Sequence, residues 1–169
     1  LPGAASKRPS DRFAAIIFED IHCQAVFGTF RTDVVRSVST FGAYHNSDRV
    51  FVAEAALRGR FIHVPEYLFL NRHHPGRYSG HVDVYRSDFH GSRMTWATAL
   101  PFWKSYIEYY RMVKRCVPER AERFRCYRHL ARWPFVNLNG FRLACDVLGR
   151  IDPRAFTLAS AVKRRLVRA

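Results

Sequence analysis

The chain has 169 residues, of which 48% are apolar, so it can fold around a core and is not a disordered segment. Its apolar stretches are far shorter than the roughly 20 residues that span a bilayer, so no membrane-spanning helix is predicted. Residues 1–89 hold 11 Lys and Arg against 9 Asp and Glu, a net of +2, and residues 90–169 hold 17 against 5, a net of +12. Such a basic half attracts phosphate in nucleic acid, lipid headgroups or a diphosphate, and charge alone does not choose among them.

Two short helices with a strand between them are predicted in the first part of the chain. Residues 11–23 have a helical pattern, with Asp11 near the start, where a carboxylate suits the helix dipole. Residues 24–31 have the composition of a strand around Gly28. Residues 32–38 then form a short helix.

The clearest helix follows a short loop. Ser47 is suited to its N-cap, Arg58 to its last turn and Gly59 to the position just after it. The residues from Phe61 to Leu70 then predict two strands separated by a break at Pro65.

The rest of the chain is polar at first and then helical. Residues 71–79 are predicted to be a polar loop, and residues 80–98 have too weak a pattern for an assignment. Helical periodicity returns over residues 100–117, 119–133 and 137–148, and Asp152 is placed to cap a last basic helix.

Aromatic side chains alternate with Arg and Lys in these C-terminal helices, which allows three interpretations. The aromatic residues can pack against the rest of the protein, or they can lie on an anionic membrane surface. The third interpretation is nucleic-acid binding, which no helix-turn-helix, RNA-binding or zinc-finger signature supports.

Four sequence features stand in a fixed order over about residues 10–80. They are the run Val-Phe-Gly-Thr-Phe-Arg-Thr-Asp at 26–33, the run Asn-Ser-Asp-Arg-Val at 46–50 opening a helix, Val-Pro-Glu-Tyr-Leu at 64–68, and Arg-His-His-Pro at 72–75. Together these features resemble the C-terminal half of the catalytic domain of family-2 glycosyltransferases of the GT-A type.

The resemblance implies an α/β fold, a partial GT-A-like sandwich around a mostly parallel sheet. Residues 1–89 would be the acceptor-side half of that domain, and residues 90–169 a basic, mostly helical extension. The nucleotide-binding half and its Asp-x-Asp metal motif do not occur in this sequence. By resemblance the chain takes part in transfer of a sugar from a nucleotide-sugar donor to a glycan or lipid-linked acceptor, with inversion and with Mn²⁺ or Mg²⁺. The fragment alone is expected to be inactive.

The same resemblance places the catalytic base at Asp48, at the start of the helix. The alternative is a first-turn carboxylate that only stabilises the helix dipole. Arg72 and His74 fall where the family binds the donor diphosphate, and His74 is also a candidate metal ligand. The alternative for both is a solvated loop.

Three further residues are candidates for the acceptor side. Gly28 would let an acceptor approach the backbone, or it is required for packing. Arg31 belongs to the same motif. Glu54 could face the same cleft as Asp48, or it forms a surface ion pair with Arg58 at the i,i+4 spacing of a helix.

Four cysteines, none in a C-x-x-C pair, indicate reduced thiols in the cytoplasm. The enzyme hypothesis therefore places the chain in the cytoplasm, with docking at the inner membrane face. The alternative is a non-catalytic basic module that binds a membrane surface or nucleic acid. Half of a parallel sheet would also expose an edge, so self-association into a homo-oligomer is expected.

Overall fold

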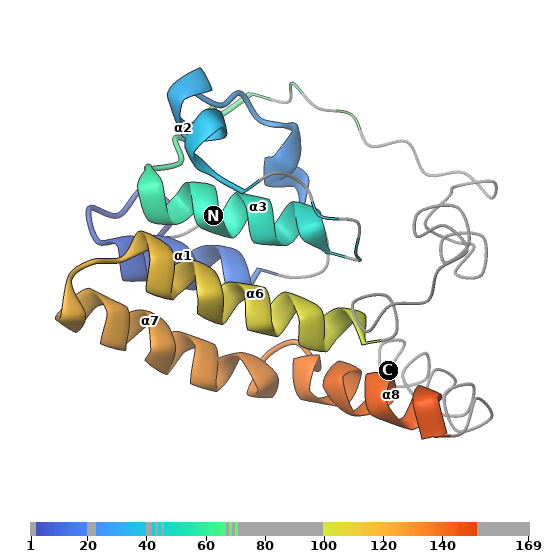
Figure 1. Cartoon of the computed structure of the whole chain (residues 1–169). Helices are drawn as coiled ribbons and strands as arrows, with labels where there is room; N and C mark the ends of the chain where they lie inside the picture. The colour runs from blue at the N-terminus through green and yellow to red at the C-terminus, as the bar shows by residue number, and fades with distance from the viewer. Residues whose placement is uncertain are drawn as a thin grey trace.

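The computed structural model describes residues 3–19, 23–39, 42, 44, 46–66, 68, 70 and 100–151. Helices account for 68% of these residues, and none of them lies in a strand. The predicted partial α/β sandwich is therefore wrong for the described part of the chain, which is helical (Figure 1). The sheet edge from which self-association was expected is likewise not present in these ranges.

The elements follow the chain as α1 (Pro9–Ile17), the 3-10 turn η1 (Gln24–Phe27), α2 (Thr32–Ser37), α3 (Ser47–Arg58), α6 (Pro101–Cys116), α7 (Arg120–Arg132), the 3-10 turn η3 (Trp133–Phe135) and α8 (Asn139–Ile151). The helices predicted from residue 32 onward are confirmed to within about three residues at each end. Helix α1 starts two residues earlier than predicted and is already complete at Ile17. The predicted loop 71–79 and the helix from Asp152 lie outside the described residues.

None of the three predicted strands is present where the structure describes the chain. Residues 24–27 form the 3-10 turn η1 instead, and the described residues from 59 to 70 are irregular. Four apolar side chains of this second segment are exposed, namely Ile62 (76%), Val64 (51%), Leu68 (74%) and Leu70 (88%). An apolar composition is a local property, whereas a strand exists only when a second strand accepts and donates its backbone hydrogen bonds.

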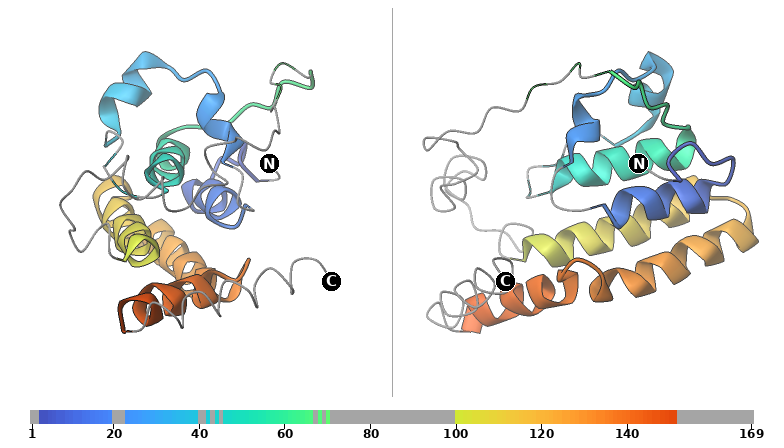
Figure 2. Two further views of the ribbon diagram at one scale, coloured as in Figure 1. Left: turned by 90° about the vertical axis from the view of Figure 1, so that its right-hand side faces the viewer. Right: turned by 180° about the vertical axis from the view of Figure 1, so that it is seen from behind.

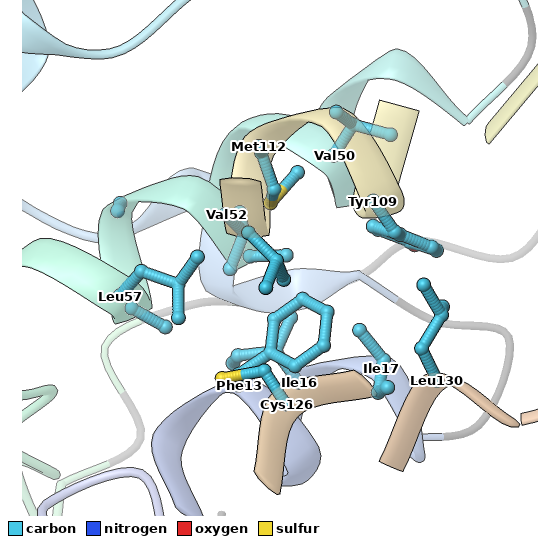
Figure 3. Close-up of a cluster of buried hydrophobic side chains, with 14 of the residues drawn as sticks. Phe13, Ile16, Ile17, Val50, Val52, Leu57, Tyr109, Met112, Cys126 and Leu130 are labelled. Atoms are coloured by element: carbon cyan, nitrogen blue, oxygen red, sulfur yellow. The ribbon is translucent and has the colours of Figure 1, made fainter. Parts of the chain in front are cut away.

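Helices from both ends of the chain share one core. Helix α3 packs on α1 and α6, and α7 packs on the same two helices from the other side (Figures 1 and 2). In Figure 3 the side chains of Phe13, Val52, Met112 and Leu130 come from these four helices and meet in a single cluster. The boundary predicted between residues 89 and 90 lies outside the described residues, but the helices on its two sides are joined by this core.

The aromatic residues of the C-terminal helices divide into two groups. Tyr109 and Trp133 are 1% and 4% exposed, and their rings lie 6.1 Å apart in the core. Phe124 and Phe135 are 66% and 89% exposed. Packing against the rest of the protein therefore accounts for the first group only. Within the described ranges, no helix combines the length and the apolar character that crossing a bilayer requires.

Candidate functional site

The start of α3 places Asp48 in a defined position. Asn46 precedes the helix with a φ of 64°, in the left-handed region that Asn tolerates better than most residues. The N-cap position is thus Asn46, and Ser47, which the sequence predicts as the cap, is the first helical residue. Asp48 follows in the first turn, half-buried, and its Oδ1 accepts a hydrogen bond from the backbone N–H of Arg49 at 2.8 Å.

The Asp48 carboxylate keeps one oxygen available. In the described part of the chain no Lys, Arg or His forms an ion pair with it. The neighbouring Arg49 directs its guanidinium to the backbone carbonyl of Glu19, at 2.6 Å. An ionised carboxylate has lone pairs for about four hydrogen bonds, so Asp48 can still accept a proton from a ligand.

The carboxylate of Glu54, the second acidic candidate on α3, already accepts hydrogen bonds from other side chains. It is 1% exposed, and its two oxygens accept hydrogen bonds from Arg58 at 3.1 Å and from Arg115 of α6 at 2.8 Å. The thiol of Cys116 lies 3.4 Å from the first of these oxygens. The predicted i,i+4 pair with Arg58 is confirmed, although it is buried at the α3–α6 contact and not on a free surface. Glu54 is thereby a structural link between the two helices.

Burial by itself would raise the pKa of Glu54, but the hydrogen bond from Arg58 and the charge of Arg115 lower it overall. A lowered pKa means that Glu54 stabilises the fold above its unfolded pKa of about 4.3, and that this contribution is lost as the pH falls through the lower, folded value. We expect Glu54→Gln to lower the free energy of unfolding at pH 7 by about 2 kcal/mol, the size of a charge-assisted hydrogen bond.

Urea unfolding at pH 7 and at about pH 3.5 measures both effects. The variant should also lose less stability than the wild type on acidification. Glu66→Gln is the control, because Glu66 is exposed. Equal stability of Glu54→Gln and the wild type at pH 7 would contradict a structural role.

A pocket of about 150 Å³ lies between α3, α6 and the residues that precede α3. Glu54 and Ser47 line it from α3, and Lys104 and Glu108 line it from α6. Ser47 directly precedes Asp48, so the pocket lies beside the start of α3. The pocket residues on α6 were not among the sequence candidates. Their i,i+4 spacing signals a surface pair in any helix, and only the packing of α6 on α3 turns it into a pocket wall.

The remaining candidates are not brought into this pocket. Gly28 ends η1, and a Cβ there would lie 3.2 Å from the carbonyl oxygen of Ala25, so its small size serves local packing. Arg31 is 83% exposed and pairs with Asp33 at 3.1 Å. Arg72 and His74 lie outside the described residues.

No metal ligand is assigned among the described residues. Within the ranges that the structure covers, no three His, Cys, Asp or Glu side chains gather as the ligands of a metal ion do. All four cysteines are free thiols. Burial raises the pKa of the Cys23 thiol to about 12, and the charge of Asp48 adds to this, so the sulfur is a poor nucleophile and a poor ligand at neutral pH.

The chain matches no model of a protein family, no curated protein and no solved structure. Its function therefore has to be inferred from the residues at the start of α3 and from the sequence motifs that surround them.

Proposed function

We propose that the chain is the acceptor-side part of a glycosyltransferase, which moves a sugar from a nucleotide-sugar donor to a hydroxyl of a glycan or a lipid-linked acceptor. Asp48 is the general base of this reaction. The observation that supports the assignment is the contrast between the two acidic residues on α3. Glu54 is buried with its oxygens occupied by two arginines, whereas Asp48 is half-buried, forms no ion pair among the described residues and directly follows the pocket residue Ser47.

In the proposed reaction Asp48 removes the proton of the acceptor hydroxyl as its oxygen attacks the anomeric carbon. The bond from that carbon to the diphosphate breaks, and the configuration inverts because attack comes from the opposite face. Arg72 and His74 are proposed to bind the departing diphosphate. The divalent cation that the resemblance implies would offset the charge of that diphosphate when bound. The described residues offer no ligand set for this cation.

Sugar transfer itself tests the proposal. The protein that carries this chain is mixed with UDP- or GDP-sugars, Mn²⁺ or Mg²⁺ and a glycan acceptor, and the release of nucleoside diphosphate is measured. Release that depends on the acceptor and is lost in Asp48→Asn supports the assignment. Failure of that protein to bind any nucleotide sugar by calorimetric titration would contradict it.

A second candidate function, docking on an anionic membrane surface in the cytoplasm, is favoured by the exposed side of α7. Three exposed residues at i,i+4 spacing, Arg120, Phe124 and Arg128, form this side, and the exposed Phe135 of η3 follows; we call these four residues the α7 stripe. Helix α7 lies on the side of α6 that faces away from α3 (Figure 1). Its buried acid, Glu122, accepts a hydrogen bond from the backbone N–H of Ser10 and so faces inward.

The chemistry of the α7 stripe suits a lipid surface better than a nucleic acid. Exposed phenylalanines can enter the boundary between headgroups and acyl chains, and each arginine near an anionic surface contributes about 1 kcal/mol. Residues 119–135 contain five Arg and two Glu, so the local charge has the required sign.

We expect Arg120→Ala/Arg128→Ala to weaken binding to vesicles that contain phosphatidylserine about 30-fold, because two such contributions are lost. Vesicle sedimentation measures the change. Arg31→Ala/Arg36→Ala is the matched control, since it removes two exposed arginines, one directly before α2 and one in its last turn. Equal binding to neutral and anionic vesicles, or tighter binding to nucleic acid than to either, would contradict docking on a membrane.

A further inference from the structure

The pocket between α3 and α6 has a size and a wall chemistry that point to a class of ligand. Its volume is about 150 Å³. Sites for drug-sized ligands measure roughly 300–1,000 Å³, so this pocket accepts a ligand of about one ring. The polar side chains that line it and carry the argument are Tyr44, Ser47, Glu54, Lys104, Glu108 and Arg115.

The charged groups of the pocket balance one another. Arg115 donates to Glu54 at 2.8 Å, and Lys104 donates to Glu108 at 2.6 Å. The walls therefore carry two cations and two carboxylates, already paired. A phosphate or a carboxylate would have to compete with Glu54 and Glu108 for these cations, and a cationic ligand would meet the same obstacle at the carboxylates. A neutral ligand does not disturb either pair.

Two hydroxyl groups of the pocket remain available. Among the described residues, no group forms a hydrogen bond with the hydroxyl of Tyr44 or with that of Ser47. Burial, reinforced by the charge of Glu108, raises the pKa of Tyr44, so its phenol keeps its proton at neutral pH. Each hydroxyl can donate one hydrogen bond and accept others, which matches the donor and acceptor pairs on a polyhydroxylated ring.

The ring of Tyr44 lies close to Lys104 and to Gly42. The Lys104 ammonium lies 5.2 Å from its centroid. The backbone of Gly42 is so close that a Cβ there would lie 2.2 Å from a ring carbon. Tyr44 therefore supplies an aromatic wall to the pocket.

From these features we propose that the α3–α6 pocket binds a neutral, polyhydroxylated six-membered ring, the size of one monosaccharide unit, and disfavours charged rings. Binding depends only on the pocket. That the ring is the acceptor of sugar transfer rests on the proposed function, because Ser47 of the pocket immediately precedes Asp48.

The test uses three rings of similar size and different charge, namely a methyl glucopyranoside, glucuronate and glucosamine. Saturation-transfer NMR with the wild-type protein, without nucleotide sugar, should detect the neutral ring and give at least about fivefold weaker signals for the charged ones. Tyr44→Phe and Ser47→Ala each remove one oxygen and keep the shape of the wall, and each should weaken binding about fivefold. Tyr110→Phe is the control, since Tyr110 is half exposed and does not line the pocket.

Three results would overturn the proposal: no signal from the neutral ring, tighter binding of a charged ring, or unchanged binding in both pocket variants with far-UV circular dichroism like that of the wild type. The readout does not involve turnover. A protein that binds the ring but transfers no sugar would therefore contradict the proposed function and leave the pocket assignment intact.

Discussion

The Asp48→Asn variant should turn over at least about 100-fold more slowly than the wild type, because a positioned general base contributes roughly 10²- to 10⁴-fold to the rate. Asn has nearly the same shape as Asp, and its amide oxygen can still accept the hydrogen bond that Asp48 receives from the N–H of Arg49 at 2.8 Å. The variant loses the ability to take up a proton and little else. We therefore expect kcat to fall with KM almost unchanged, the pattern of an interaction made only in the transition state.

Asp33→Asn is a matched control for this experiment. Asp33 also lies in the first turn of a helix, α2, but its side chain is 67% exposed and paired with Arg31. If Asp48 acts only on the helix dipole, Asp48→Asn should cost about 0.3–1 kcal/mol of stability, and neither substitution should change the rate. A kcat for Asp48→Asn within about threefold of the wild type would remove Asp48 from the catalytic role.

The second large effect is expected at Arg12, whose replacement by Met should lower the free energy of unfolding by about 3 kcal/mol. Arg12 is 5% exposed. Its Nε donates to the carbonyl of Ala56 at 2.6 Å and its Nη2 to that of Leu57 at 3.0 Å, and Nη1 donates to the carbonyls of Ser6 and Lys7. The carbonyls of Ala56 and Leu57 belong to the last turn of α3, where the helix provides no partners.

Urea unfolding of Arg12→Met and Arg12→Lys measures this contribution. Lys offers no planar fork, so it should restore only a minor part of the stability. Arg8→Met is the control, because Arg8 directly precedes α1 and its side chain is exposed. A loss of less than about 1 kcal/mol in Arg12→Met would show that the end of α3 does not depend on this side chain.

The sequence by itself determined the helices that local interactions specify. Capping residues and apolar periodicity predict α2, α3, α6, α7 and α8 to within about three residues, because these signals act between residues at most four positions apart. The pair of Glu54 and Arg58 was predicted for the same reason.

Strands depend on partners far along the chain, and the sequence could not supply them. The apolar stretch from Phe61 to Leu70 and the composition of residues 24–31 resemble strands locally, yet neither is paired in the described structure. The resemblance to an α/β family also led us to expect strands, and for the described residues that expectation of strands was wrong.

Only the tertiary structure distinguished the two acidic residues of α3. Asp48 and Glu54 lie six positions apart, and no local sequence signal separates them. Only the resemblance to glycosyltransferases favours Asp48 as the catalytic base. Glu54 is buried because Arg115, 61 residues later, reaches its carboxylate from α6. The same contact of α3 with α6 creates the pocket that contains Tyr44 and Lys104. Helix starts and ends follow from neighbours in the chain, but burial, ion pairing and cavities depend on which helices pack together, and that is set by the core as a whole.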